Sequence, residues 1–157
     1  MKTFFISLLI LFFALPCFAQ LSGRVVSIFD GDTFTLLTSD KKQIKIRLHG
    51  VDCPEKGQPF GQKAKGFVSK RIFSKMVAVS PKKKDRYGRT LGLVFIEGEC
   101  LNEALLKNGF AWHYMRYDKN KLWSELEAEA RRKKIGLWAD KHAQPPWEFR
   151  KAKKADR

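Results

Sequence analysis

The sequence predicts an α+β protein that is mainly β, with five short strands closed into a small barrel and three α-helices. Five segments rich in β-branched and apolar residues lie before residue 97, and short strands in such close succession favour a barrel over a parallel sheet. Helical spacing of apolar residues occurs in three other places. A chain of 157 residues without an internal repeat or a second apolar span is expected to form one domain.

The predicted strands cover residues 24–29, 33–37, 43–48, 76–80 and 90–96. The first two are separated by Asp30-Gly31-Asp32, which is a turn or bulge signal. The third alternates strictly, with isoleucine and leucine on one side and Lys45 and Arg47 on the other, as is typical of a half-buried strand. We therefore expect Arg47 on the face that points away from the apolar set.

Three segments have the apolar spacing of a helix. The first has its marker residues at positions 64, 67, 68, 71 and 72. The second covers residues 101–108 and stops at Gly109, and the third has apolar residues at 122, 126 and 130 and is closed by Gly136. Acidic residues lie early in the third helix and basic residues late, which suits the helix dipole.

The first 19 residues have the layout of a cleaved signal peptide. Lys2 gives a positive start, an apolar run of about 12 residues follows, and small residues stand at Cys17 and Ala19. We expect cleavage after Ala19 and export to the periplasm or the medium. The protein would then contact the membrane only through this segment. The alternatives are an uncleaved anchor, for which the run is short, and a lipoprotein signal, for which Pro16 is unsuited.

The rest of the chain is expected to comprise a folded domain over residues 20–148 and a disordered basic tail over residues 149–157. The full chain has 31 Lys and Arg against 16 Asp and Glu, a net charge of +15. So large a positive charge attracts polyanions. We therefore expect nucleic acid or an anionic envelope surface as a partner, rather than a charge that only keeps the protein soluble.

Two cysteines, Cys53 and Cys100, would remain after cleavage. Export invites a disulfide between them, but the sequence leaves its geometry open. No Cys and His residues have the spacing of a zinc site, and the three histidines are scattered along the chain.

Several acidic and basic residues near the predicted strand ends suit phosphodiester hydrolysis. A hard cation can neutralise phosphate charge, and Asp32, Asp52 and the main-chain carbonyl of Cys53 supply oxygen ligands for it. Glu55 can orient a water molecule or act as a base. Arg47 and Arg89 can stabilise the extra negative charge of the transition state through paired hydrogen bonds.

The motifs that carry these residues resemble those of the staphylococcal nuclease family. They are Asp-Gly-Asp-Thr at residues 30–33, Arg-Leu-His-Gly-Val-Asp-Cys-Pro-Glu at 47–55, Asp-Arg-Tyr-Gly-Arg at 85–89 and Leu-Asn-Glu-Ala-Leu at 101–105, within a resemblance that runs from Val25 to Trp138. The resemblance implies an oligonucleotide-binding barrel (OB-fold) of five strands with three helices.

The resemblance also implies a calcium site. By position, Asp32 and Asp52 correspond to the carboxylates that bind Ca²⁺, and Asp30 to an acid close to the metal. Cys53 corresponds to a residue that offers its backbone carbonyl, where the best-known member has Thr. Glu55 corresponds to the residue that orients the attacking water or acts as the base.

The remaining correspondences concern the substrate. Arg47 and Arg89 match the two phosphate-binding arginines, and Arg86 and Tyr87 match groups that contact a neighbouring phosphate. Tyr117 matches one tyrosine of the nucleotide site. Where a second tyrosine and a longer loop are expected, this chain has Met115 and the short segment 55–60.

The implied function is that of a monomeric, exported, calcium-dependent endonuclease that cleaves DNA and RNA and leaves 3′-phosphate ends, without a stable protein partner. Two alternatives are open. Degenerate members of the family bind nucleic acid without cleaving it, but they usually lose the acids and arginines that are present here. An envelope-associated structural protein would use the basic tail and would not explain the five matched site residues.

Overall fold

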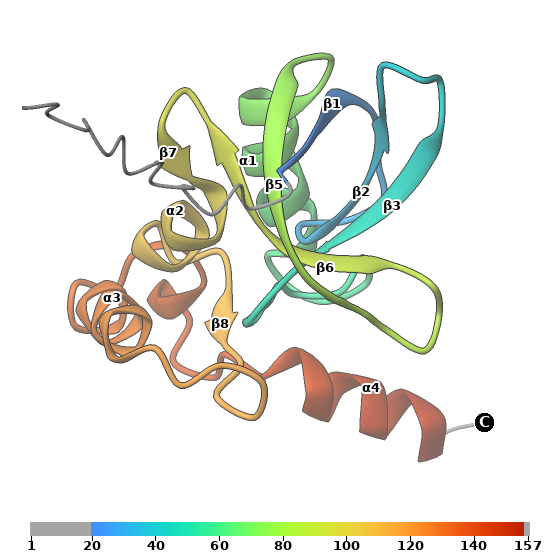
Figure 1. The fold of residues 1–157 in the computed structure, drawn as a ribbon. Coiled ribbons are helices and arrows are strands. Elements are labelled where there is room, and N and C mark those ends of the chain that lie inside the picture. Colours follow the sequence, from blue (N-terminus) through green and yellow to red (C-terminus); the bar gives the residue numbers. More distant parts are fainter. Residues whose placement is uncertain (1–19, 156–157) are drawn as a thin grey trace, which may run out of the picture.

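Five strands close into a barrel in the computed structural model, which describes residues 20–155. They pair as antiparallel neighbours in the order β3-β2-β1-β5-β6, and a parallel pairing of β3 with β6 closes the ring (Figure 1). This confirms the predicted barrel of five strands. The strands are β1 (Leu21–Ile28), β2 (Thr33–Leu37), β3 (Gln43–Leu48), β5 (Met76–Lys84) and β6 (Thr90–Ile96).

Strand β5 continues four residues beyond the end that the sequence predicts. Its pairing with β6 changes register between Pro81 and Lys83. A proline lacks the N–H that a regular ladder needs and is tolerated at such a bulge. The extension carries β5 to the Asp85–Arg89 turn.

Three strands in the described residues have only two residues each, which is too short for a sequence alternation to predict them. β4 (Val51–Asp52) pairs with β8 (Trp112–His113), and β7 (Glu99–Cys100) extends the sheet beyond β6. The β4–β8 pairing holds Asp52 opposite Trp112. A short antiparallel ladder therefore fixes one of the acids that the sequence singled out.

The three predicted helices are present as α1 (Gly61–Ile72), α2 (Leu101–Lys107) and α3 (Lys121–Arg132), followed by a 3₁₀ turn, η1 (Gly136–Ala139). A fourth helix, α4 (Pro146–Ala155), replaces most of the disordered tail predicted for residues 149–157, so that prediction was wrong for residues 149–155. Pro146 opens α4, where its fixed φ and missing N–H suit the first turn. The predicted signal peptide, residues 1–19, lies outside the described residues.

The main core fills the barrel and the space between the barrel and its helices. Val25, Phe34 and Ile46 line it from the strands, and Ala64 and Val68 from α1. Ile46 is fully buried while its neighbour Lys45 is exposed, which confirms the alternation predicted for β3. In the described residues Cys53 and Cys100 are both free thiols.

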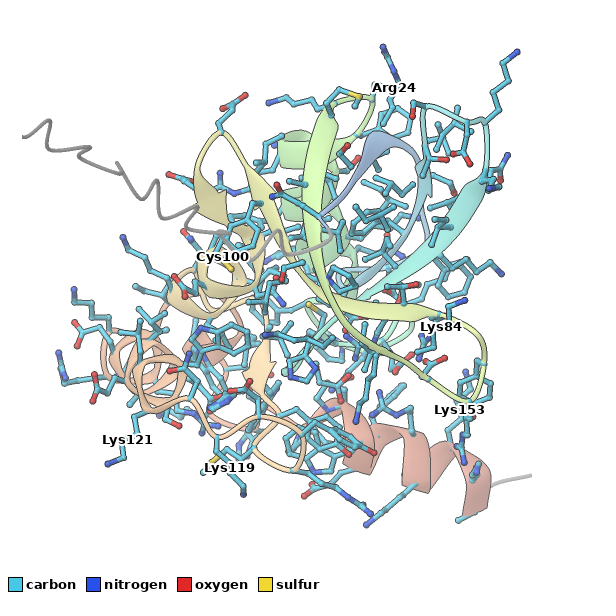
Figure 2. All side chains as sticks on the ribbon, in the orientation of Figure 1. Arg24, Lys84, Cys100, Lys119, Lys121 and Lys153 are labelled. Carbon is cyan, nitrogen blue, oxygen red and sulfur yellow. The ribbon has the colours of Figure 1, made fainter. Side chains whose placement is uncertain are left out.

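A second apolar cluster supports the carboxyl-terminal part of the chain. Trp112, Leu137 and Trp138 form its buried centre, with Trp147 packed against it. Long charged side chains project outward over the molecule, as Lys119, Lys121 and Lys153 show in Figure 2. None of the helices in residues 20–155 is long and apolar enough for a transmembrane span.

Candidate active site

Asp32 and Asp52 are brought together at one end of the barrel, each at the end of a strand. Both carboxylates are almost completely buried, with exposed fractions of 5% and 1%. The Cys53 amide donates to Asp32 Oδ2 at 2.7 Å, and Asp30 Oδ1 accepts from the Asp32 amide at 3.0 Å. These bonds fix the Asp30–Asp32 turn against the segment that follows β4.

Gly31 allows this close approach. A Cβ atom at Gly31 would lie 2.8 Å from the Cβ atom of Cys53 and 2.9 Å from that of Ala64. Both distances are shorter than van der Waals contact, so only glycine fits between the two residues. The Asp-Gly-Asp motif is therefore also a packing motif that places Asp32 beside Cys53.

Arg47 bridges the two acids. Its Nη1 lies 3.1 Å from Asp32 Oδ2, and its Nη2 donates to Asp52 Oδ1 at 2.8 Å. Nη1 also donates to the carbonyl oxygens of Leu48 and Val51, at 3.1 and 2.9 Å. The guanidinium thus stands on the face of β3 away from Ile46, as the alternation predicts, but it is covered by acids rather than by solvent.

Burial and charge shift the pKa values of these groups in a coherent way. Burial, helped by the charge of Asp30, raises the pKa of Asp32 from 3.8 to about 7, against the opposing effects of Arg47 and the Cys53 amide. Burial also raises the pKa of Asp52. Burial disfavours the charged form of Arg47, but the two aspartates outweigh it and raise the Arg47 pKa. In the metal-free protein, burial therefore disfavours the charged form of Asp32.

The donor chemistry of this pair fits a hard divalent cation. Ca²⁺ takes carboxylate and carbonyl oxygens, and both acids are desolvated carboxylates with the Cys53 main chain beside them. Burial raises the pKa of the Cys53 thiol well above its usual range, so the sulfur stays protonated in the metal-free protein. Residues 20–155 contain no cluster of three or more His, Cys, Asp or Glu side chains arranged around a metal position.

Arg89 reaches the same end of the barrel from the turn between β5 and β6. Its Nε donates to Asp85 Oδ2 at 2.7 Å, and its Nη1 lies 3.5 Å from the hydroxyl of Thr33. Asp85 Oδ1 also accepts from the amides of Tyr87 and Arg89, at 2.9 Å each. Burial would raise the pKa of Asp85, but the hydrogen bonds from Arg89 outweigh it and lower that pKa. Sequence reasoning gave Asp85 no role, although Asp at the start of a turn is a known signal for such bonds.

Glu55 lies in the loop after β4, and its carboxylate is 35% exposed. Its side-chain partner in the structure is Arg150 of α4, whose Nη1 lies 2.6 Å from Glu55 Oε1. The same guanidinium binds Asp52, with Nη2 2.8 Å from Oδ2. Sequence reasoning missed Arg150 because it assigned that part of the chain to a disordered tail.

The three candidate substrate residues stand at the surface around these groups. Tyr87 and Tyr117 are largely exposed, and the Arg86 guanidinium lies 4.9 Å from the Tyr87 ring centre. Tyr117 lies in the turn that follows β8, and Nζ of Lys83 on β5 lies 5.5 Å from its ring centre. Met115, which replaces an expected tyrosine, is also exposed. Both tyrosines thus lie at the surface with basic side chains close to their rings.

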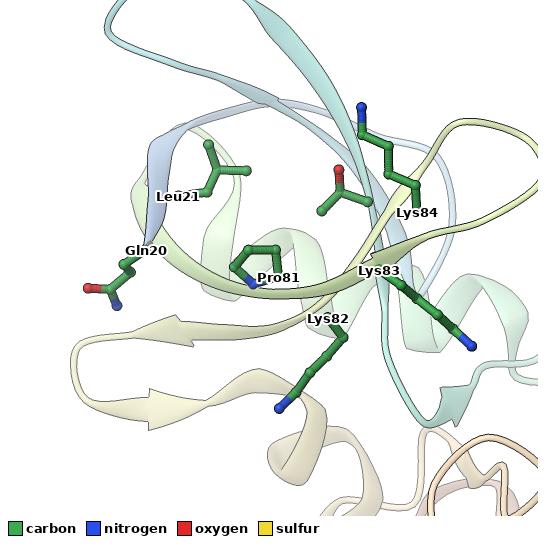
Figure 3. Close-up of a pocket in the computed structure, with 7 residues that line it drawn as sticks. Gln20, Leu21, Pro81, Lys82, Lys83 and Lys84 are labelled. Carbon is green, nitrogen blue, oxygen red and sulfur yellow. The ribbon is translucent and has the colours of Figure 1, made fainter. Parts of the chain in front are cut away.

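A surface hollow elsewhere on the barrel does not include the site. It has a volume of about 530 Å³ and lies beside β5 (Figure 3). No acidic residue lines it; its lining consists of Gln20, Leu21, Pro81, Lys82, Lys83, Lys84 and Thr90. The candidate site is therefore recognised by its charged side chains and not by this hollow.

Comparison with known proteins shows the family to which the chain belongs. The family model described as "Staphylococcal nuclease homologue" matches residues 45–140. An "Uncharacterized endonuclease" of Haemophilus influenzae is 40% identical over 155 residues, which cover 98% of this chain and 87% of that protein. A "Micrococcal nuclease" of Shigella flexneri is 39% identical over 92% of this chain and 89% of its own length. "Staphylococcal-like nuclease CAN1" of Arabidopsis thaliana is 42% identical over 72% of this chain and 35% of its own length. The chain therefore belongs to the staphylococcal nuclease family.

Proposed function

We propose that the protein is an exported, calcium-dependent nuclease that hydrolyses phosphodiester bonds of DNA and RNA and leaves 3′-phosphate ends. The observation that carries the proposal is the meeting of Asp32, Arg47 and Asp52 at one end of the barrel, with Arg89 beside Thr33. The nuclease and endonuclease names of relatives that align over most of the chain support the same activity.

Asp32, Asp52 and the backbone carbonyl of Cys53 would hold the calcium ion. Bound there, it would supply positive charge that holds and neutralises a phosphate oxygen. The raised pKa of Asp32, caused mainly by burial, is consistent with a carboxylate that gains from a nearby cation. Asp30 adds negative charge next to this position without being one of the ligands.

The two arginines and Glu55 would divide the remaining work. A water molecule attacks phosphorus opposite the 5′ oxygen, and Glu55 orients it and accepts its proton. Arg47 and Arg89 hold the phosphate oxygens, whose negative charge increases in the transition state. The bond from phosphorus to the 5′ oxygen breaks and the 5′ oxygen takes up a proton from solvent, so the phosphate stays on the 3′ oxygen.

Cleavage of both DNA and RNA follows from a site that binds phosphate through charge. Arg86, Tyr87 and Tyr117 would contact the neighbouring phosphate and nucleotide, and exposed tyrosine rings can stack on any base. The net charge of +15 would raise the local concentration of either polyanion. We expect little sequence preference.

Export and a monomeric state complete the proposal. Cleavage after Ala19 would leave a mature chain that begins at Gln20. Intact mass and amino-terminal sequencing of the protein recovered from a host with a secretion pathway would test the cleavage. Sedimentation analysis would test the monomer.

The central experiment is cleavage of single-stranded DNA, duplex DNA and RNA by the mature protein, with calcium and with excess chelator. We expect cleavage that requires calcium, and products that a phosphatase specific for 3′ ends can modify. Tight binding without cleavage in either condition would instead support the alternative of a non-catalytic nucleic-acid-binding module on the same barrel.

A further inference from the structure

The carboxyl-terminal segment holds the Glu55 loop at two points. Arg150 Nη1 lies 2.6 Å from Glu55 Oε1, and Gln58 Nε2 donates to the carbonyl oxygen of Gln144 at 2.6 Å. The partners are 95 and 86 residues apart in the chain. Two contacts of such long range on one short loop indicate that α4 and the segment before it belong to the site.

Gln58 ties the loop together from within. Its Oε1 accepts from the Glu55 amide at 3.1 Å, and the Gln58 amide donates to the Glu55 carbonyl at 2.9 Å. The side chain is only 7% exposed, so its amide group is satisfied on one side by Glu55 and on the other by Gln144. A buried polar group bonded at both ends defines one position for the loop.

Helix α4 is itself anchored. The Trp147 ring stacks on the Tyr114 ring with 4.9 Å between centres and 5° between planes, and it meets the Trp112 ring edge-on at 5.7 Å. Arg150 follows Trp147 by three positions, so both side chains lie on the same face of the helix. The face that docks on the domain therefore also directs Arg150 to Asp52 and Glu55, and Figure 1 shows α4 on the same side of the molecule as β8.

We propose that Arg150 and Gln58 are positioning residues that hold Glu55 in its working place, and that α4 is an integral part of the active site. The inference rests on the proposed nuclease function. Glu55 lies on an irregular loop, and in residues 20–155 the Arg150 guanidinium is the one side-chain group that pairs with its carboxylate. Charge-assisted bonds of this kind fix orientation as well as adding energy.

The opposing possibility is that Arg150 blocks the site. It contacts both oxygens of Asp52, at 2.8 and 3.3 Å, and a cation bound to Asp52 has to share this carboxylate with Arg47 and Arg150. If Arg150 mainly competes with the cation, its removal will raise activity. If Arg150 mainly positions Glu55, its removal will lower activity, so the two effects have opposite signs.

The test compares Arg150→Ala, Arg150→Lys and Gln58→Ala with Lys151→Ala, a control that removes one positive charge from an exposed position of the same helix. We expect Arg150→Ala and Gln58→Ala to lower kcat by about 10- to 100-fold with KM within about twofold, because small misplacements of a reacting group are costly. Arg150→Lys should recover part of the loss, since an ammonium can serve one carboxylate at a time. Lys151→Ala should behave like the original protein.

Amide hydrogen exchange supplies a readout that does not depend on catalysis. In Arg150→Ala the amides of Glu55 and Gln58 should exchange about tenfold faster, while the barrel amides keep their rates. Unchanged or increased kcat in Arg150→Ala would overturn the proposal, and so would a reduced kcat with unchanged exchange in the loop. If the original protein fails to cleave any nucleic acid, the nuclease function fails, and the exchange rates alone then decide whether Arg150 holds the loop.

Discussion

Arg47 Nη2 lies 2.8 Å from Asp52 Oδ1, and this ion pair joins β3 to β4. Both side chains are largely buried. Because Arg47 also contacts Asp32, one guanidinium pairs with two buried carboxylates. The pairing gives Arg47 a structural role in addition to the phosphate-binding role that we propose.

Arg47→Ala should therefore destabilise the protein in the absence of metal. Removal of the guanidinium leaves two adjacent buried carboxylates, and breaking a buried ion pair costs about 3–5 kcal/mol. Urea unfolding in chelator would measure the loss, and excess calcium should restore part of it. Arg47→Lys is the control with the same charge, and it should recover little because one ammonium cannot replace the two-pronged contact. A loss below about 1 kcal/mol would contradict this account.

Arg89→Ala should lower kcat by about 100- to 1000-fold, the usual cost of losing one donor to the transition state. Stability should change little, because Arg89 is partly exposed in a turn. Asp85→Asn is the matched variant: it keeps the turn but weakens the pairing that holds the Arg89 side chain, and its loss should be smaller. Equal activity in Arg89→Ala and the original protein would show that Arg89 has no part in the reaction.

Glu55→Ala and Glu55→Gln should both lower kcat by about 100- to 10,000-fold, the range for a general base. Glu55→Gln retains a side chain of the same length that can still accept a bond from Arg150, so it separates the charge of Glu55 from its contacts. Steady-state kinetics at saturating calcium would measure both variants. Near-normal turnover in Glu55→Gln would contradict the assignment of Glu55 as the base.

Much of the fold and the acidic centre of the site could be predicted from the sequence, because those features depend on local patterns. The period-two alternation of β3 placed Arg47 away from Ile46, and the Asp-Gly-Asp turn placed Asp32 at a strand end. The burial of Asp52 could not be predicted from the local sequence, because it depends on the pairing of β4 with β8, which places Asp52 opposite Trp112.

The contribution of α4 could not be predicted for a different reason. Its lysines and arginines resemble a disordered tail in composition, and the helix is stabilised by tertiary contacts such as the stacking of Trp147 on Tyr114. Arg150 meets Asp52 across 98 residues of chain. The local signal that was available was Pro146 before Glu148, which is typical of the first turn of a helix.

Gly31→Ala should disturb the site although it adds a single methyl group. The new Cβ would lie 2.8 Å from the Cβ atom of Cys53, so the turn that carries Asp32 must shift. We expect a loss of about 1–3 kcal/mol in the free energy of unfolding, as for other overpacked positions, together with weaker calcium binding by calorimetry. Gly66→Ala is the control: it lies inside α1, nothing lies within 4 Å of its added Cβ, and it should be neutral or stabilising. Unchanged calcium affinity in Gly31→Ala would contradict the packing role of Gly31.

The stability of the metal-free protein should fall as pH rises through the range in which Asp32 titrates. Its pKa is raised from 3.8 to about 7 in the folded state, mainly by burial, so the folded protein holds more protons than the unfolded chain between these values. Its contribution to stability is therefore fully present below about pH 4 and is lost as pH rises to about 7. Asp52, whose pKa burial also raises, acts in the same direction, while Asp85, whose pKa is lowered by the bonds from Arg89, acts in the opposite one.

Urea unfolding across this pH range should give a shallower dependence for Asp32→Asn than for the original protein, and Glu125→Gln, on an exposed position of α3, should leave it unchanged. Saturating calcium should also flatten the dependence, because a cation at Asp32 favours the charged carboxylate in the folded state. Binding of calcium near neutral pH should accordingly release protons, which calorimetry in buffers of different ionisation enthalpy can count. The same pH dependence in Asp32→Asn and the original protein would mean that Asp32 is already ionised without metal. In that case calcium binding would not depend on shifting the Asp32 pKa.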